Sequence, residues 1–224
     1  MDRQERRKLK DAFCIEMTKH FHSRGFRFRK EDGLYLKSVN SKYQEGYGLT
    51  IQDGAWGYMV TPGPSLRVNE VERIFFRTAF WGERGREIKA TVGTSVGLLI
   101  DSHAKNVDSF QIRLESKEDL EPAICEAIRV YEQFAIPYFD RFRDLKEIDA
   151  VINDRPRQSC IHIIMPYERC STGLIVAKLT GRSNYGELAE YYGSLMKNGN
   201  NGFYWRHFEA LLQDLASGAY VTAL

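Results

Sequence analysis

The sequence predicts an α+β protein in which a mostly antiparallel sheet is packed by helices and followed by a C-terminal helical subdomain. Three observations lead to this class: an amphipathic opening segment, a series of short alternating segments separated by turn residues, and helical spacing toward the end of the chain. The composition of the 224 residues, 43% hydrophobic and 28% charged, is that of an ordinary globular protein. Disorder, collagen and coiled coil are excluded.

The first element is an amphipathic helix between Lys8 and His22. Its apolar side chains recur at every fourth residue, and Gly25 follows where a left-handed helix end is expected. The side chains that should face the core are Leu9, Phe13, Met17 and Phe21.

Strand candidates follow this helix. Residues 26–30 and 34–37 alternate with a period of two around the turn Glu31-Asp32-Gly33, which predicts a β-hairpin. A second pair of strands should flank Asp53-Gly54, and Pro62-Gly63-Pro64 should break the pattern. Outside the first hairpin, strands are expected at 46–52, 56–61, 88–93 and 109–114, with a polar loop at 82–87.

Helices are expected in the rest of the first domain. Residues 68–80 have helical spacing, although Phe75-Phe76 would also suit a bent strand, and we favour the helix. A helix at 120–134 should end or kink at Pro137, and further helical packing should follow at 138–152.

The polar, proline-containing segment 153–158 is the expected boundary between an α+β domain at 1–152 and a helical subdomain at 159–224. In the subdomain, Ser171 could cap one helix, and Asn184 with Glu187 resembles a capping box for another. The expected helices end at Gly181 and span 185–197 and 203–216.

Two features of charge and pattern suggest a binding surface. Residues 1–30 carry ten Lys and Arg against four acidic residues, which marks either a solvated helix face or a surface for an acidic partner or nucleic acid. In the hairpin, Phe26 and Phe28 should face the core with Leu34 and Leu36. The alternate residues would then lie on the other face of the hairpin and form a cationic strip with one aromatic ring. This strip consists of Arg27, Arg29, Tyr35 and Lys37.

The sequence contains no common nucleotide-binding, hydrolase or metalloprotease motif, and we expect neither a metal nor a cofactor. Cys160, His162 and Cys170 match no standard zinc spacing, so a buried thiol in a core segment is the simpler interpretation. Cys170 also precedes the expected helix cap, which could favour its thiolate with His162 as base. All four thiols should be free.

The order of the opening helix, Gly25-Phe26-Arg27-Phe28-Arg29, a run of strands, and Ala135-Ile136-Pro137-Tyr138-Phe139-Asp140-Arg141-Phe142 resembles bacterial families of unassigned activity. Among these families, the chain resembles domain of unknown function 4304 over roughly residues 5–150. The resemblance implies a bacterial α+β protein and supplies no catalytic residues. Some small proteins of this kind look like toxin-neutralising or phage-defence components, which favours a protein-binding role.

Three functions follow as hypotheses. The leading one is a non-enzymatic cytoplasmic protein-binding module with an unknown, acidic partner; a nucleic-acid-binding module and a cysteine-dependent enzyme are the alternatives. The longest apolar stretches, such as 96–100, fall far short of a membrane helix, and the charged start lacks the apolar segment of a secretory signal. We therefore expect no membrane partner and a cytoplasmic location.

Overall fold

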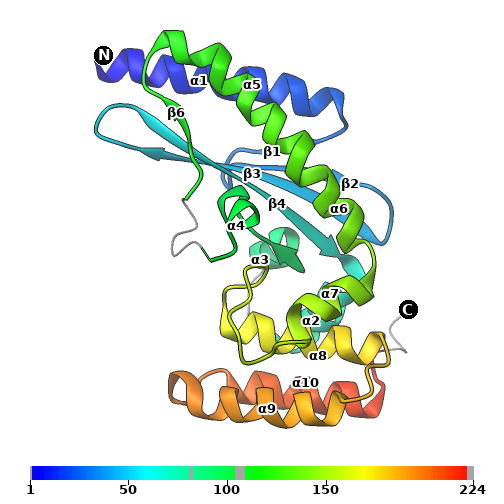
Figure 1. The fold of residues 1–224 in the computed structure, drawn as a ribbon. Coiled ribbons are helices and arrows are strands. Elements are labelled where there is room, and N and C mark those ends of the chain that lie inside the picture. The colour runs from blue at the N-terminus through cyan, green and yellow to red at the C-terminus, as the bar shows by residue number, and fades with distance from the viewer. Residues whose placement is uncertain (1, 81–82, 104–108, 221–224) are drawn as a thin grey trace. The chain divides into compact units, whose positions relative to one another are not determined.

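The computed structural model of the chain describes residues 2–80, 83–103 and 109–220 (Figure 1). It confirms the α+β class, because an antiparallel sheet is combined with helices along most of the described chain. The α-carbon positions group into two units, which we describe separately. The first unit comprises Met1–Leu66 and Gly93–Arg141, and the second comprises Arg67–Val92 and Phe142–Leu224.

The first unit contains the sheet and the opening helix. Its helices are α1 (Arg3–Ser23), α4 (Val96–Ile100), the 3₁₀ turn η1 (Lys117–Asp119), α5 (Leu120–Val130), the π-helical turn η2 (Tyr131–Ala135) and α6 (Ile136–Phe142). Its strands are β1 (Arg27–Arg29), β2 (Leu34–Ser38), β3 (Tyr43–Asp53), β4 (Tyr58–Val68), β5 (Val92–Gly93) and β6 (Ile112–Leu114). The ends of β4, β5 and α6 cross the division between the units.

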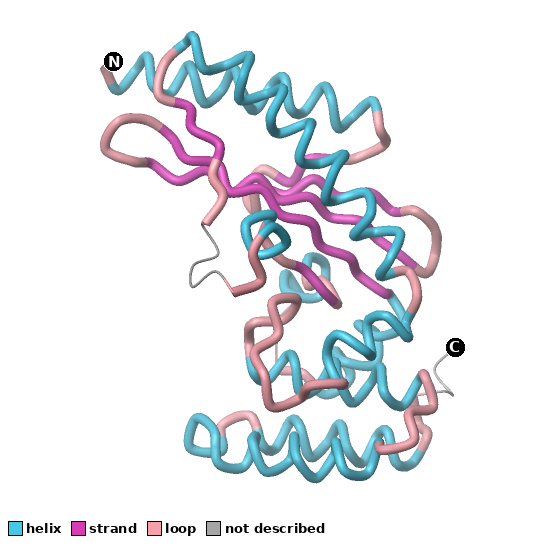
Figure 2. The backbone as a smooth tube through the Cα atoms, viewed as in Figure 1, coloured by secondary structure: helices cyan, strands magenta, loops and turns pink. Residues whose placement is uncertain are grey.

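The sheet has the strand order β1-β2-β3-β4-β5, and β6 pairs with β4 (Figure 2). The pairs β1–β2, β2–β3 and β4–β6 are antiparallel. Both predicted hairpins are present, but β4 continues through Pro62-Gly63-Pro64, so the expected break there is wrong.

The prolines fit because of the side of β4 on which they lie. The carbonyl of Pro64 accepts a 3.0 Å hydrogen bond from the Thr94 amide, and a residue in a strand directs its nitrogen and its carbonyl to the same side. The proline nitrogens therefore point to the side of β4 that pairs with β6 and β5. The prolines lie between these two pairings, so the missing amide hydrogens interrupt neither of them. Gly63 is required there as well, because a β-carbon would collide with the Thr94 carbonyl oxygen.

The helix α1 buries the predicted stripe against the sheet. Leu9, Phe13, Met17 and Phe21 are each no more than 4% exposed. The helix starts five residues earlier than expected because Asp2 accepts hydrogen bonds from the Gln4 and Glu5 amides, at 2.7 and 2.8 Å, and forms a capping box.

Phe21 lies at the centre of the aromatic core of the first unit. Its ring centroid is 4.6 to 5.6 Å from the rings of Phe26, Tyr35, Tyr47 and Tyr131. These rings come from β2, β3, η2 and the turn after α1, so a single side chain joins four parts of the unit. In Figure 1, α1 and α5 accordingly lie over the same face of the sheet.

Pro137 does not end the long helix, and the helix is instead irregular just before it, so of the two expected effects an end at Pro137 is wrong and a kink stays a prediction. The chain runs from α5 through η2 into α6, and the Ile136 amide bonds back to the Tyr131 carbonyl, five residues earlier. Pro137, which has no amide hydrogen to donate, follows directly after this wider turn as the second residue of α6.

The second unit is helical. It contains α2 (Asn69–Thr78), α3 (Glu83–Ile88), α7 (Leu145–Asn153), α8 (Pro166–Leu179), α9 (Tyr185–Asn198), the 3₁₀ turn η3 (Gly199–Gly202) and α10 (Trp205–Ser217). Residues 68–80 are thus mainly helical, as favoured. A polar loop was expected at 82–87 and a strand at 88–93. Residue 82 lies outside the described residues, and 83–93 instead contain α3 and the two residues of β5.

The compact units divide the chain differently from the boundary expected at 153–158. The segment 67–92 belongs with the C-terminal helices, because α2 packs its buried Phe75 ring 5.8 Å from Tyr167 of α8. Arg77 of α2 also pairs with Asp214 of α10. Asn153, expected in the linker, is 1% exposed at the end of α7.

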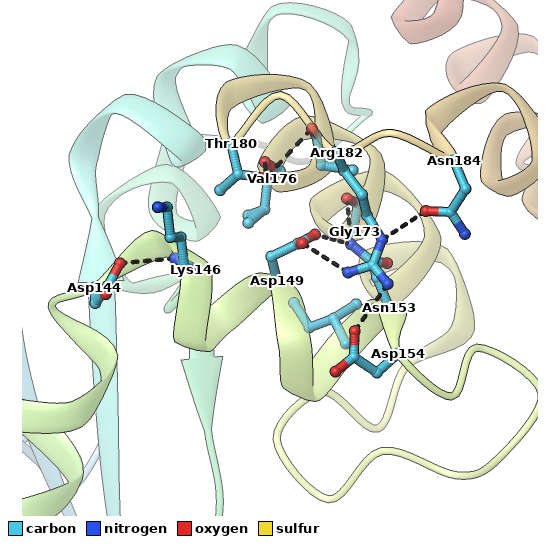
Figure 3. Close-up of polar contacts among 12 residues, drawn as sticks. Asp144, Lys146, Asp149, Asn153, Asp154, Gly173, Val176, Thr180, Arg182 and Asn184 are labelled. Carbon is cyan, nitrogen blue, oxygen red and sulfur yellow. Dashed lines mark hydrogen bonds and ion pairs between the residues drawn. The ribbon is translucent and has the colours of Figure 1, made fainter.

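Arg182 organises the polar contacts of this unit (Figure 3). Its guanidinium donates to Asp149 at 2.7 Å, to Asp154 at 2.8 Å and to Asn184 at 2.8 Å. The Asn184 side chain therefore bonds to Arg182 and makes no cap hydrogen bond to α9, although α9 begins as expected.

Asn153 extends this network into the core. Its amide nitrogen donates to Asp149 at 2.6 Å and to the Gly173 carbonyl at 3.0 Å (Figure 3). Its oxygen accepts a hydrogen bond of 2.8 Å from the Tyr192 hydroxyl. The polar groups joining α7, α8 and α9 thus have partners, as buried polar groups require. We assign this network a structural role.

Within the residues that the structure describes, no helix combines the length and apolar character needed to cross a membrane.

The aromatic core predicts a large effect of truncation at its centre. Replacing Phe21 by alanine should lower the free energy of unfolding by about 3–5 kcal/mol, since a fully buried ring is removed. Ile15→Ala on the same helix is the control, because its side chain is 54% exposed and should change stability by about 0.5 kcal/mol or less. Urea denaturation measures both, and equal losses would contradict the central role of Phe21.

The buried phenols predict a loss of stability in alkali. Burial raises the pKa of Tyr35 and of Tyr131 to about 12, above the ordinary value of about 10. Since the folded pKa is the higher one, this contribution is complete below about pH 10 and falls as the pH rises toward about 12. Urea denaturation across this range should show the decline, and Tyr35→Phe should reduce it. A decline as steep in the variant as in the parent would rule out Tyr35 as a source.

Candidate binding groove

A groove of about 1490 Å³ runs along α1 in the first unit. Its other walls are the β1–β2 turn, the end of β3 and the start of β4. Its charged lining consists of six basic residues, Arg3, Arg6, Arg7, Lys10, Lys19 and Lys30, and three acidic ones, Asp11, Asp32 and Asp53. We call this surface the basic groove.

The helical repeat explains why α1 contributes so many cations. Arg3, Arg7 and Lys10 are spaced by four and three residues, so they lie on one flank of the helix. The adjacent stripe is buried against the sheet, which leaves this flank along the groove. Burial of the apolar stripe therefore aligns the cations.

Some of these cations are held by the protein itself. Arg6 pairs with Asp53 and donates to the carbonyls of Gly54 at 2.7 Å and Gly57 at 3.0 Å. Its guanidinium also lies 5.4 Å from the centroid of the Tyr58 ring. Arg6 thus fastens α1 to the β3–β4 turn and has a structural role.

Other groove cations have weak acidic partners or none. Arg7 is 4.0 Å from Asp11, and Lys19 is 2.7 Å from the exposed Glu16. Arg3, Lys10 and Lys30 have no carboxylate within 4.0 Å among the residues that the structure describes. Lys10 makes only a distant contact to Tyr58, with its ammonium 5.7 Å from the ring centroid. These three cations are available to an anionic partner.

The aromatic floor of the groove is largely occupied. Phe28 stacks on Tyr35 with a centroid distance of 4.6 Å and an interplanar angle of 27°. Tyr35 is 2% exposed, and its hydroxyl lies 3.2 Å from the Thr18 hydroxyl. Tyr58 is 9% exposed, with the Arg6 and Lys10 cations near its ring. The floor therefore offers little open ring surface.

The predicted strip of Arg27, Arg29, Tyr35 and Lys37 does not share one face of the hairpin. Phe28 pairs with Tyr35, so these two residues face the same side, whereas Arg27 pairs with Leu36. The expected parity assumed the three-residue turn 31–33, but four residues, 30–33, separate the last paired residues. Because side chains alternate along a strand, one additional turn residue moves each side chain of the second strand to the opposite face of the hairpin.

The four strip residues consequently have different surroundings. Arg27 is exposed, and Arg29 lies 3.2 Å from Asp32. Lys37 is 5.5 Å from the Phe26 ring centroid and 3.8 Å from the buried Glu45. Tyr35 is in the core, and it is the one member of the strip that lines the groove. Their role in binding stays a prediction.

Cys170 is a buried thiol, as the simpler interpretation expected, and the alternative in which a helix start activates it has no support in the structure. The helix α8 begins at Pro166 and not at Ser171, so Cys170 lies inside the helix and away from its amino end. Its side chain is 2% exposed, and burial raises the pKa of the thiol to about 12. His162 packs against Phe142, with ring centroids 5.0 Å apart.

The cysteines are free, and the described part of the chain has no group of three or more His, Cys, Asp and Glu side chains arranged to hold a metal ion.

The groove was only partly predictable from the sequence. The basic excess in residues 1–30 was the available signal, and it pointed to α1. Pattern alone could not identify Lys10 and Lys30 as available or Arg6 as engaged, because their partners lie in other elements.

Comparisons with known proteins found no matching family model, no matching curated protein and no matching solved structure. The resemblance to domain of unknown function 4304 therefore stays a prediction.

Burial predicts the order in which the thiols react. Cys125 is exposed and should be alkylated first, whereas Cys170 is buried with a raised pKa and should react last. Mass spectrometry of the folded protein after timed iodoacetamide treatment gives the rates. Labelling of Cys170 ahead of Cys125 would restore it as a nucleophile.

Proposed function

We propose that the protein is a non-enzymatic binding protein whose basic groove receives an acidic segment of a partner protein. The observation that carries this proposal is the set of cations along the groove, Arg3, Lys10 and Lys30, that lack a carboxylate partner among the described residues. An acidic segment would supply the missing countercharges. A bacterial, neutralising or defence-related role rests on the sequence resemblance alone, and the cytoplasmic location expected from the sequence is kept as part of this proposal.

The dimensions of α1 support a short, extended occupant. Sixteen helical steps separate Arg3 from Lys19, which corresponds to about 24 Å at 1.5 Å per residue. An extended chain covers this distance in about seven residues. The lining includes Ile15, which is 54% exposed, so the occupant should combine acidic residues with an apolar one.

Trp56 adds a second contact point beside the groove. It is 84% exposed on the β3–β4 turn, between the two glycines whose carbonyls bind Arg6. Tryptophan is enriched among the residues that contribute most to protein–protein affinity. An exposed tryptophan next to a cationic groove supports a protein partner.

The nucleic-acid alternative has less support. Single-stranded nucleic acids are bound by cationic grooves in which successive bases stack on open aromatic faces. In this groove Tyr35 is 2% exposed and Tyr58 is 9% exposed, while Phe28 already stacks on Tyr35. Trp56 could stack one base but does not line the groove.

Charge reversal within the groove tests the proposal. The double variant Lys10→Glu with Lys30→Glu should bind a fluorescein-labelled peptide of glutamates and leucines at least tenfold more weakly, because two attractive charges become repulsive. Fluorescence anisotropy at physiological ionic strength measures the affinity. The matched control is Lys42→Glu with Arg113→Glu, which changes net charge equally at exposed positions outside both the groove lining and the predicted strip, and should change affinity less than twofold.

Two outcomes would contradict the proposal. Equal weakening by both double variants would show attraction by overall charge, with no role for the groove. Tight binding of an oligothymidylate that the acidic peptide does not displace would favour the nucleic-acid alternative. Thermal melts of each variant confirm that the fold is retained.

A further inference from the structure

The second unit contains a separate pocket lined by arginines. Its volume is about 480 Å³, and it is formed by Arg67, Glu72, Arg73, Phe76, Arg77 and Arg86. These residues come from the end of β4, from α2 and from α3. Every one of them belongs to the second unit, so the pocket is independent of the basic groove.

The periodicity of α2 produces this arrangement. Val71, Ile74 and Phe75 are buried in the core of the unit. Arg73 and Arg77 lie four residues apart, which places both on one face of the helix beside the pocket. As in α1, burial of the apolar face aligns basic side chains elsewhere on the helix.

Glu72 is the one carboxylate of the lining, and its charge is already balanced. The side chain is fully buried, and its oxygens lie 3.0 and 3.1 Å from the Lys89 ammonium. The Thr91 hydroxyl donates to the same carboxylate at 2.8 Å. The pocket is therefore lined by four arginines and by one carboxylate whose charge is balanced by a buried lysine.

Arg67 is fixed by two hydrogen bonds and keeps N–H donors that could bind a ligand. It donates to the Asn69 side chain at 3.1 Å and to the Lys89 carbonyl at 2.8 Å. Its second terminal nitrogen makes no hydrogen bond to a described residue. Burial lowers the pKa of Arg67, which reflects the cost of keeping this cation away from water. A bound anion would offset that cost.

Arg77 and Arg86 complete the wall. Arg77 binds Asp214 through two hydrogen bonds of 2.7 and 2.9 Å, which orient its guanidinium. Arg86 lies 5.9 Å from the centroid of the Phe76 ring and has no acidic partner within the described parts of the chain. The pocket thus combines oriented guanidinium groups with one that is available.

We propose that this pocket binds a phosphate dianion, either free or as the terminal group of a small organic molecule. Arginine is the side chain suited to this ligand, because its planar fork donates two hydrogen bonds to adjacent phosphate oxygens. The volume falls in the range of small-molecule sites and leaves space beyond a phosphate group.

Calorimetric titration with inorganic phosphate, adenosine monophosphate and adenosine tests this assignment on the full chain. We expect the two phosphates to bind and adenosine not to bind. Arg86→Gln should weaken phosphate binding at least tenfold, and Arg86→Lys should restore part of it, because lysine keeps the charge without the fork. Arg113→Gln is the matched control, since this exposed arginine lies on β6 in the first unit.

The relative affinities of the three ligands distinguish the possible outcomes. Tighter binding of adenosine monophosphate than of phosphate would support an organic phosphate, and equal binding would support inorganic phosphate. The proposal is overturned if neither phosphate binds at millimolar concentration, if adenosine binds as well as its monophosphate, or if Arg86→Gln binds like the Arg113→Gln control. Thermal melts exclude unfolding as the cause of lost binding, and the peptide affinity of the basic groove should be unchanged by Arg86→Gln.

Discussion

Burial of the Phe21 ring is the constraint on which the first unit depends. The ring contacts side chains from β2, β3, η2 and the turn after α1, so these elements share a common core. Since Phe21 ends a stripe that recurs every fourth residue, the whole helix must present that stripe to the sheet. The orientation of the basic flank follows from this requirement. The groove is thus a consequence of how the core is packed.

The second unit is organised by buried charges that have partners. Glu72 and Lys89 pair in the interior, and Arg182 bridges Asp149, Asp154 and Asn184. Removing one member of such a pair leaves an uncompensated charge away from water, which is strongly destabilising. Because each of these charges has an opposite charge or hydrogen-bond partner within the chain, we assign them a structural role. Arg86 of the neighbouring pocket differs from them, because it has no acidic partner among the described residues.

Pairing is therefore the criterion that separates structural cations from those available to a ligand. Arg6 and Arg182 have the same side chain as Arg86, but both donate several hydrogen bonds to fixed acceptors within the chain. Lys10, Lys30 and Arg86 have no such acceptors in the described residues. Net charge does not reveal this distinction, since the chain as a whole carries only +2. The local balance of donors and acceptors is the informative quantity.

The sequence alone determined the features that depend on local periodicity. The stripe of α1 and the two hairpins follow from side-chain spacing, which reports directly on which face of an element is buried. At 68–80 the spacing favoured a helix but left a bent strand open, and the fold decided for the helix. The basic excess near the start of the chain was also visible without coordinates.

Tertiary structure decided the features that depend on one residue of register or on distant partners. A four-residue turn placed Tyr35 in the core, and a helix start at Pro166 placed Cys170 in the helix interior. Residues 67–92 joined the C-terminal helices because α2 packs on α8, a contact between segments about ninety residues apart in the sequence. Local spacing contains no information on turn length or long-range packing, so these features could be determined only by the folded chain.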